Sequence, residues 1–333
     1  MSGRFRALVV TEATRGSFER SIVDRPMTDL PAGEILIRVL YSSLNYKDAL
    51  SATGDKGVTK RYPHVPGIDA AGIVEESSTT AFAAGEEVIV TGYELGSNHD
   101  GGFAEYVRGP AAWVVRRPAG LTLRECMIYG TAGFTAGLSV HRLLHHGVDP
   151  DQGPVLVTGA GGGVGSLAVG ILARAGFHVV ASTGKKESTG LLVSLGAREV
   201  IGREAVTDPT GRALLSGRWA GAVDTIGGPT LDAILRGTKL FGAVAACGNV
   251  VSGDLHTSIY PFILRGVSLI GINSAFTPMP LRLQIWSELA TSWKPERLEA
   301  IVTEVSLSAL TPSIDRILQG GIQGRILVNT HAW

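Results

Sequence analysis

The sequence predicts an α/β protein in which a doubly wound parallel sheet is joined to a second domain rich in β-strands. Three observations support this fold class. Apolar strand-like segments fill the first third of the chain, strands alternate with helices after residue 150, and a glycine cluster follows the first of these later strands. Such alternation is typical of a parallel sheet with helices on both faces. The length of 333 residues fits two domains.

The composition excludes several classes of protein. The 30 Lys and Arg balance the 30 Asp and Glu, so no overall field attracts nucleic acid or an anionic membrane. No apolar stretch approaches the ~18 residues of a membrane span, and the first apolar run is too short for a signal peptide. With only Cys126 and Cys247, a disulfide framework or a four-cysteine zinc lobe is excluded. We expect a cytoplasmic protein without nucleic-acid or membrane partners.

The first third is predicted to be β-rich. Alternating or continuous apolar residues, separated by Gly and Pro, predict strands over residues 6–12, 34–41, 71–75 and 87–93. The pattern changes around Leu121, and a helix is predicted from Thr135 to His146. After the central part of the chain, a helix over 312–318 and a strand over 325–328 follow, and we expect this tail to return to the first domain.

The central part is predicted to alternate between strands and helices. The strands are expected at residues 155–158, 177–181, 199–202, 222–226, 243–247 and 268–272. Between the first of them and a helix from Ser166 lies the segment with Gly159, Gly161, Gly162, Gly163, Val164 and Gly165. Glycines let the backbone approach a pyrophosphate, whose charge then faces the helix N-terminus. The match to G-x-G-x-x-G is imperfect, but the strand–turn–helix context predicts a Rossmann dinucleotide-binding domain.

The end of the second strand predicts which dinucleotide binds. A site selective for NAD carries an acid there, which holds the ribose 2′-hydroxyl. This strand ends instead in Ser182, Thr183, Gly184 and Lys185, and Arg203 follows the next strand. Hydroxyls and cations bind a 2′-phosphate, which a carboxylate would repel. We therefore expect NADPH, although the lysines also fit a solvated loop.

Five motifs in order resemble one subfamily: Ser42-Ser-Leu-Asn-Tyr-Lys-Asp48, Pro66-Gly-Ile-Asp-Ala-Ala-Gly72, Gly130-Thr-Ala-Gly-Phe-Thr-Ala136, Ala245-Ala-Cys-Gly248 and Ile322-Gln-Gly-Arg325. The whole chain resembles the medium-chain dehydrogenase/reductase superfamily, and these motifs resemble its zinc-free YhdH/YhfP group of quinone oxidoreductases and acryloyl-CoA reductases. The resemblance implies a GroES-like catalytic domain (1–123 and 296–333) and a Rossmann NADPH-binding domain (124–295). It also implies a homodimer joined near residues 260–275.

A catalytic zinc site is not expected. Zinc-dependent relatives carry Gly-His-Glu where this chain has Gly67-Ile68-Asp69, and they supply an early cysteine ligand that this chain lacks. His141 and His145 are spaced to share one helix face, but a surface or packing role explains them better. Without a Lewis acid, the accessible reaction is hydride addition to a polarised acceptor such as an enone, a quinone or an enoyl thioester.

Such a reaction needs hydrogen-bond donors where negative charge develops on the carbonyl oxygen. Asn45 and Tyr46 are the candidate donors, and Asp48 is expected to orient them or the nicotinamide ribose. The resemblance places this segment, Tyr46 included, beside the nicotinamide. The alternative is a structural turn in which Tyr46 packs and Asp48 caps a helix.

The resemblance implies further cofactor contacts. Thr131 would meet the nicotinamide carboxamide, and the other residues implied to line the cofactor site are Gly248, Asn249, Ile263, Ser274 and Arg325.

A basic loop with Lys56, Lys60 and Arg61 could bind the phosphates of a CoA substrate, or its charges could simply be solvated. Together these observations favour NADPH-dependent reduction of acryloyl-CoA to propionyl-CoA by a metal-free enzyme. The alternatives are an NADPH:quinone oxidoreductase and a non-catalytic NADPH-binding or sensor protein. Fold and cofactor alone do not decide among them.

Overall fold

The computed structural model describes residues 3–332, which form two compact units. Unit 1 comprises the chain up to Thr131, Ala275–Leu283 and the chain from Val302 on, and unit 2 comprises Ala132–Ser274 and Gln284–Ile301. This division by packing differs from the predicted functional boundaries, which remain a prediction. No helix among the described residues is both long and apolar enough to span a membrane.

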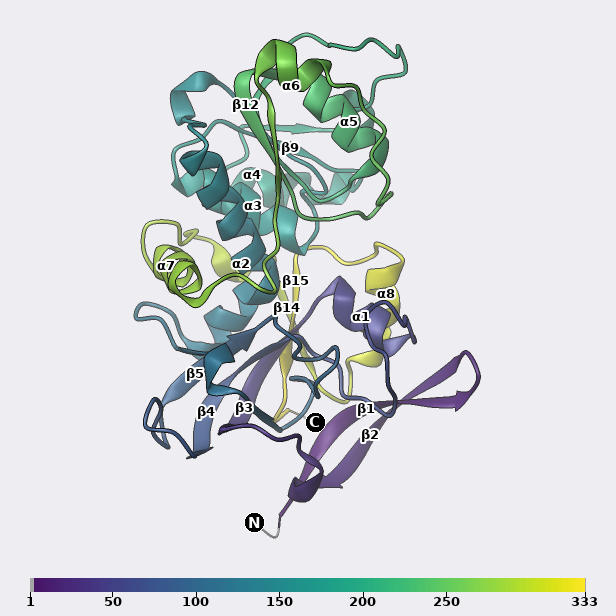
Figure 1. Cartoon of the computed structure of the whole chain (residues 1–333), viewed down its shortest axis with the longest axis vertical. Coiled ribbons are helices and arrows are strands. Elements are labelled where there is room, and N and C mark those ends of the chain that lie inside the picture. Colours follow the sequence, from purple (N-terminus) through teal and green to yellow (C-terminus); the bar gives the residue numbers. More distant parts are fainter. Residues whose placement is uncertain (1–2, 333) are drawn as a thin grey trace. The chain divides into compact units, whose positions relative to one another are not determined.

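Unit 1 is mainly antiparallel β-structure (Figure 1). The strands β1 (Arg4–Thr14) and β2 (Ser17–Pro26) form a hairpin. A seven-stranded sheet has the order β14-β15-β3-β4-β5-β7, with β6 paired to β3. Its strands are β3 (Ile35–Leu44), β4 (Asp69–Ser77), β5 (Glu87–Thr91), β6 (Tyr106–Gly109), β7 (Val114–Arg116), β14 (Val302–Ser306) and β15 (Arg325–Asn329).

The tail of the chain completes the sheet of unit 1. The strand β15 pairs antiparallel with β3, so that Ile326 lies opposite Leu44. Two helices, α1 (Tyr46–Ala52) and α8 (Thr311–Leu318), contact each other beside these strands. A buried cluster joins them to the hairpin through Leu8, Ala49 and Ile314. The predicted helix and strand of the tail, and their return to the first domain, are therefore confirmed.

Unit 2 is a Rossmann fold. Six parallel strands have the order β10-β9-β8-β11-β12-β13, which corresponds to the 3-2-1-4-5-6 order of dinucleotide-binding sheets. They are β8 (Val155–Val157), β9 (Val179–Ser182), β10 (Glu199–Ile201), β11 (Trp219–Asp224), β12 (Thr238–Ala246) and β13 (Ser268–Gly271). The helices include α3 (Gly163–Arg174), α4 (Thr189–Ser194), α5 (Gly228–Gly237), α6 (Tyr260–Arg265) and α7 (Met279–Ala290), which starts in unit 1.

The core of unit 2 lies between its sheet and its helices. Leu156, Ala222 and Val244 point from neighbouring strands toward Leu231 and Ile234 of α5. Near-continuous apolar strands are expected when both faces of a parallel sheet are covered. The predicted doubly wound parallel sheet is confirmed.

Three features of the secondary structure differ from the prediction. The strands β2, β6, β7 and β14 were not predicted, because no residue of β2 or β14 is buried and β6 and β7 are short. The helix expected from Thr135 begins earlier, since α2 spans Leu123–His145. Gly130 interrupts it with φ 50° and ψ −154°. The two glycines of Gly130-Thr-Ala-Gly133 explain why the first part of this helix was not predicted from the sequence, because glycine is a poor helix former.

Candidate active site

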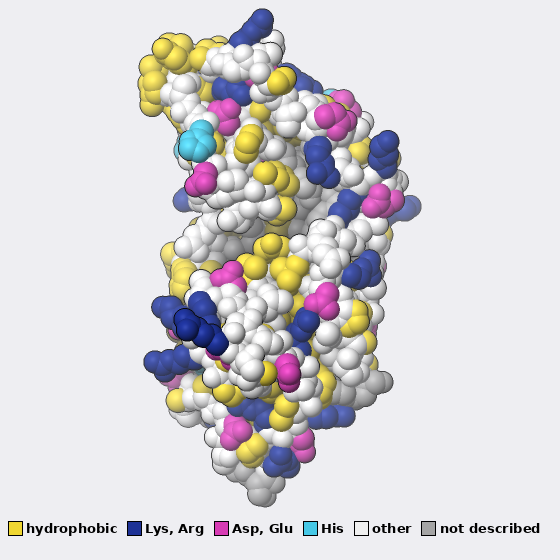
Figure 2. All heavy atoms as spheres, turned by 90° about the vertical axis from the view of Figure 1, so that its right-hand side faces the viewer, with side chains coloured by type: hydrophobic (Ala, Val, Ile, Leu, Met, Phe, Trp, Pro, Cys, Tyr) yellow, Lys and Arg dark blue, Asp and Glu magenta, His cyan; other side chains and the backbone are white. Residues whose placement is uncertain are grey.

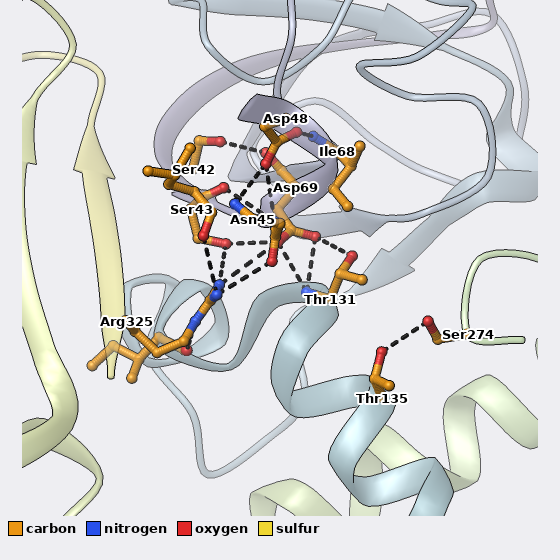
Figure 3. A network of polar contacts seen from close by, with 12 residues as sticks. Ser42, Ser43, Asn45, Asp48, Ile68, Asp69, Thr131, Thr135, Ser274 and Arg325 are labelled. Carbon is orange, nitrogen blue, oxygen red and sulfur yellow. Dashed lines mark hydrogen bonds and ion pairs between the residues drawn. The ribbon is translucent and has the colours of Figure 1, made fainter. Parts of the chain in front are cut away.

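A buried polar network lies in unit 1 and centres on Asp69, the first residue of β4 (Figure 3). Its carboxylate accepts hydrogen bonds from Ser43 Oγ at 2.6 Å and Asn45 Nδ2 at 2.7 Å. It also accepts the backbone N–H of Thr131 at 2.9 Å and its hydroxyl at 2.6 Å. Three separate segments of the chain therefore meet at one carboxylate.

Asn45 precedes α1 and is locked at both ends of its side chain. Its amide nitrogen donates to Asp69, to Asp48 at 3.2 Å and to the Ser43 carbonyl at 3.3 Å. Its amide oxygen accepts from Nη1 of Arg325 at 3.2 Å. Because the amide hydrogens have partners inside the protein, these contacts favour a positioning role. The predicted role of Asn45 as a donor to substrate stays a prediction.

Asp48 has no exposed surface and serves as a cap. It accepts the backbone N–H groups of Asn45 and Ile68, both at 2.8 Å. Burial, and next the neighbouring Asp69, raise the pKa of Asp48 to about 7. The capping contact corresponds to the structural alternative that the sequence left open for this residue.

Arg325 supplies the positive charge of this network from the first position of β15. The guanidinium is 3% exposed and donates to the carbonyls of Ile128 and Leu44 at 3.0 and 3.1 Å and to Ser43 Oγ at 2.7 Å. Its Nη2 lies 4.0 Å from Asp69. A buried guanidinium thus lies beside a buried carboxylate, and the charge of one offsets that of the other. The predicted contact of Arg325 with the cofactor stays a prediction.

Gly130 allows this network to close. A Cβ at this position would lie 2.4 Å from both Asp69 Oδ2 and Ser43 Oγ, and 2.9 Å from Nη2 of Arg325. Its positive φ also falls where side chains are strained. The glycine at position 130 therefore explains both the break in α2 and the close approach of the polar groups.

Tyr46 is the candidate donor that remains accessible. It is the first residue of α1, its side chain is 43% exposed, and no hydrogen bond within the described residues is assigned to its hydroxyl. The start of α1 is held in place by Asp48, which accepts the backbone N–H groups of Asn45 and Ile68. The exposed phenol of Tyr46 therefore stands on a helix whose first turn is fixed by hydrogen bonds.

The predicted nucleotide-binding residues lie together in unit 2. The turn from β8 to α3 contains Gly161, and Gly162 is the N-cap of α3. At the end of β9, a Cβ at Gly184 would lie 1.9 Å from Nη2 of Arg203, so the guanidinium rests directly on the glycine. The hydroxyl of Thr183 accepts the backbone N–H of Lys185 at 3.0 Å. The glycine turn fits the pyrophosphate of a dinucleotide, and the cationic groups at the end of β9 fit an adenosine 2′-phosphate.

Other predicted residues have different surroundings. Ser274 accepts a hydrogen bond from Thr135 of α2 at 2.8 Å (Figure 3). Gly248 packs against Thr225, where a Cβ would lie 2.5 Å from the Thr225 carbonyl oxygen, and Asn249 follows it. Ile263 on α6 is 64% exposed. Their contact with a cofactor stays a prediction.

The three cations of the basic loop in unit 1 differ in whether they already have a partner. Lys56 forms an ion pair with Glu12 at 3.0 Å and lies over the ring of Tyr62, 4.6 Å from its centroid. Lys60 and Arg61 are exposed, and no ion pair within the described residues is assigned to them. The loop therefore offers these two cations more readily than Lys56.

A zinc site needs several ligands close together. Among the described residues, no group of three or more His, Cys, Asp and Glu side chains could hold a metal ion. His141 is buried and its ring lies 3.9 Å from that of His145, centroid to centroid, which is a packing contact.

Asp69 and Ser43 were not among the predicted site residues. Asp69 did carry a signal, because it is an acid directly before the apolar run Ala70–Val74. Ser43 carried none.

Comparisons with known proteins agree with this fold. Residues 31–119 match the alcohol dehydrogenase GroES-like domain, and residues 163–284 match the zinc-binding dehydrogenase family. The chain is 43% identical to the acrylyl-CoA reductase AcuI of Ruegeria pomeroyi over 98% of this chain and all of that protein. It also resembles the yhdH oxidoreductase of Salmonella enterica, solved in complex with NADP, with 42% identity and a TM-score of 0.94 over 98% and 99% of the two chains. Bacillus subtilis yhfP, solved with NAD bound, gives 46% identity and a TM-score of 0.96 over 99% and 100%.

These matches span both units from end to end. The chain is therefore a medium-chain dehydrogenase/reductase, an oxidoreductase with a GroES-like and a Rossmann domain. Within this superfamily it belongs to the group of YhdH, YhfP and AcuI. The resemblance predicted from the five sequence motifs is confirmed. Although one matching family is named for zinc, the residues described above do not fit that metal.

Proposed function

We propose that this protein reduces the conjugated double bond of acryloyl-CoA to give propionyl-CoA, with NADPH as reductant and without a metal. The observation that carries the proposal is the 43% identity to an acrylyl-CoA reductase along the full length of both proteins. The accessible phenol of Tyr46, at the start of a helix whose N-terminus is held by Asn45 and Asp48, supports the same chemistry.

NADPH is the proposed cofactor. Its 2′-phosphate would bind at the end of β9, where Arg203 rests on Gly184 and no carboxylate ends the strand. Ser182, Thr183 and Lys185 would complete this subsite, and the turn with Gly161, Gly162, Gly163 and Val164 would hold the pyrophosphate at the N-terminus of α3. A relative solved with NADP supports this assignment, and another solved with NAD makes the preference worth measuring.

The chain's own residues would stabilise and orient the reacting groups. When bound, NADPH would supply the hydride for the β-carbon of the enoyl thioester. As negative charge develops on the thioester oxygen, the Tyr46 hydroxyl would donate a hydrogen bond to it. Asn45 and Asp48 would hold the start of α1, since their polar atoms are already bonded within the network. The proton for the α-carbon is not assigned to any residue.

The phosphates of CoA would bind the exposed cations Lys60 and Arg61. Lys56 would contribute less, because its ammonium is already paired with Glu12. Phosphate groups are held well by such charge-assisted contacts.

A homodimer in the cytoplasm is also proposed. The strand β13 forms an edge of the parallel sheet, and exposed apolar side chains lie on it and on the neighbouring α6. They are Ile259, Tyr260, Ile263, Leu264 and Leu269. Figure 2 shows hydrophobic side chains gathered at the end of unit 2 where α6 lies in Figure 1. An apolar edge strand is normally covered by a partner.

The first test follows NADPH oxidation with acryloyl-CoA and a benzoquinone side by side. Efficient turnover of acryloyl-CoA with slow reduction of the quinone supports the proposal. Preference for the quinone would replace it with a quinone reductase. Binding of NADPH without oxidation by either acceptor would favour a non-catalytic protein.

A further inference from the structure

A cavity of about 580 Å³ lies in unit 2, beside the segment that connects β10 to β11. Its walls are residues of the segment 205–219, the last turn of α5 with Gly237, and Arg265 at the end of α6. Cavities of roughly 300–1,000 Å³ are typical of sites for small organic molecules. The size of this cavity therefore suits a ligand of that kind.

The cavity lies at the end of the parallel sheet that is opposite to the glycine turn. Trp219, on its wall, is the first residue of β11, and Gly237 directly precedes β12, so both mark the amino ends of strands. The glycine turn follows the carboxyl end of β8, and dinucleotides bind outside the carboxyl ends of such strands. A molecule in this cavity would therefore be a second ligand, separate from the cofactor.

Three arginines on the wall have no carboxylate partner. Arg212, Arg218 and Arg265 line the cavity, and none of them forms an ion pair within residues 3–332. Guanidinium groups stay protonated at every physiological pH. A hollow lined by one sign of charge concentrates ions of the opposite sign.

The acids next to the cavity are already engaged. Among the described residues that line it, Asp208 is the only acid, and its carboxylate lies 2.7 Å from Nη1 of Arg236. Arg236 also pairs with Asp232 at 2.8 Å. This group of three carries one negative charge in excess, whereas the three wall arginines carry three positive charges. The surroundings of the cavity are therefore cationic.

Two of the wall arginines keep hydrogen-bond donors available. Arg236 donates to the carbonyl of Arg212 at 2.7 Å, which holds the backbone there, while the Arg212 guanidinium has no assigned partner within the described residues. Arg218 donates one hydrogen bond, to the Ala205 carbonyl at 3.1 Å, and its guanidinium lies 4.3 Å from the ring centroid of Trp219. Because a guanidinium carries five N–H donors, both side chains can bind a further acceptor.

Arg265 has a more structural part in the wall. Its Nη1 donates to the carbonyls of Arg236 and Thr238, both at 3.0 Å, and its Nη2 donates to that of Leu215. These bonds tie the segment 205–219 and the end of α5 to α6. Arg265 therefore adds charge to the cavity and holds its walls together.

We propose that this cavity binds a phosphate-bearing small molecule, with Arg212 and Arg218 as the phosphate ligands. The planar fork of a guanidinium matches the oxygens of a phosphate and binds them through two parallel hydrogen bonds. The volume admits both an inorganic pyrophosphate and a mononucleotide. Since the cavity lies away from the cofactor turn, binding there does not require the reduction of acryloyl-CoA.

The test is isothermal titration calorimetry of the full chain saturated with NADPH, which keeps the probes out of the cofactor site. The probes are inorganic pyrophosphate and AMP. We expect one equivalent of probe per chain, and the tighter of the two identifies the ligand as inorganic or as a nucleotide. Arg212→Gln and Arg218→Gln should each weaken this binding about 10-fold or more, the effect of one charge-assisted hydrogen bond.

Arg198→Gln is the matched control, because Arg198 is an exposed arginine of the same unit outside the cavity. It should leave the affinity unchanged. An equal loss in this variant would mean general attraction by surface charge and would overturn the proposal.

Two further outcomes would also overturn it. One is that the wild type binds neither probe in the millimolar range. The other is that Arg212→Gln binds as tightly as the wild type, which places the anion elsewhere. The Arg212 variant is expected to fold, since only the backbone of Arg212 has assigned contacts within the described residues, and its melting temperature checks this. Turnover of acryloyl-CoA is measured separately, and its absence would overturn the proposed function alone.

Discussion

At the scale of single residues, the site depends on a division between fixed and accessible polar groups. Ser43, Asn45 and Asp69 satisfy one another in the interior, whereas Tyr46 stands at the surface of unit 1. A buried network of this kind stabilises only when all its members have partners. Removing the accessible hydroxyl and removing a buried partner should therefore have different effects.

Tyr46→Phe should lower kcat with acryloyl-CoA roughly 10- to 100-fold, since one donor to the developing oxyanion is lost. The dissociation constant of NADPH should change little. Steady-state kinetics and a fluorescence titration measure the two quantities. Tyr106→Phe removes a hydroxyl from β6 of the same unit and serves as the control. Wild-type kcat in Tyr46→Phe would remove Tyr46 from the mechanism.

Asp48 should make stability depend on pH. Its pKa is raised from an ordinary 3.8 to about 7, so the folded chain keeps a proton that the unfolded chain has released. The stabilisation from this proton is complete below about pH 4 and is lost as the pH rises to about 7, at a cost of up to about 4 kcal/mol. Melting temperatures should fall less over this range in Asp48→Asn.

The control for this measurement is Asp24→Asn, because the Asp24 side chain is 59% exposed in its pair with Arg4. It should keep the wild-type dependence on pH. The same dependence in Asp48→Asn would show that Asp48 does not hold the proton.

At the scale of elements, the sequence predicted regular structure well where a period and a turn signal agreed. The glycine turn between β8 and α3 and the alternating strands of unit 2 are examples. The start of α2 was missed, because local propensity at Gly130 favours a loop and only distant groups make the helix continue there. For the same reason the role of Ser43 was not predictable, since its partners lie in β4 and β15.

Gly130→Ala should destabilise the protein by about 2 kcal/mol or more. The new Cβ would collide with Asp69 and Ser43, and the residue would be held at a φ of 50°. Gly190→Ala on α4 is the matched control, because nothing lies within 4 Å of a Cβ there and its φ is not positive. Thermal unfolding of the two variants tests this. Equal stability would contradict the account of the helix break.

At the scale of the whole molecule, the exposed apolar residues of α6 and β13 are the strongest feature outside the site. Ile263→Asp places a charge in this patch and should convert a dimer into a monomer. Light scattering coupled to gel filtration measures the mass. Val193→Asp on α4, at a residue that is 56% exposed, is the control and should leave the mass unchanged. A wild type that is monomeric would refute the proposed dimer.

The pairing of β15 with β3 also has a consequence for synthesis on the ribosome. Arg325 contacts Asn45 across 280 positions of the chain, and all residues of unit 2 lie between them in the sequence. During translation, Asp69 emerges long before the guanidinium that lies beside it. The sheet of unit 1 is therefore completed only when its final strand has been synthesised, whereas all residues of unit 2 are synthesised earlier. Premature termination before Arg325 would leave a nascent chain in which the Asp69 carboxylate has no guanidinium beside it.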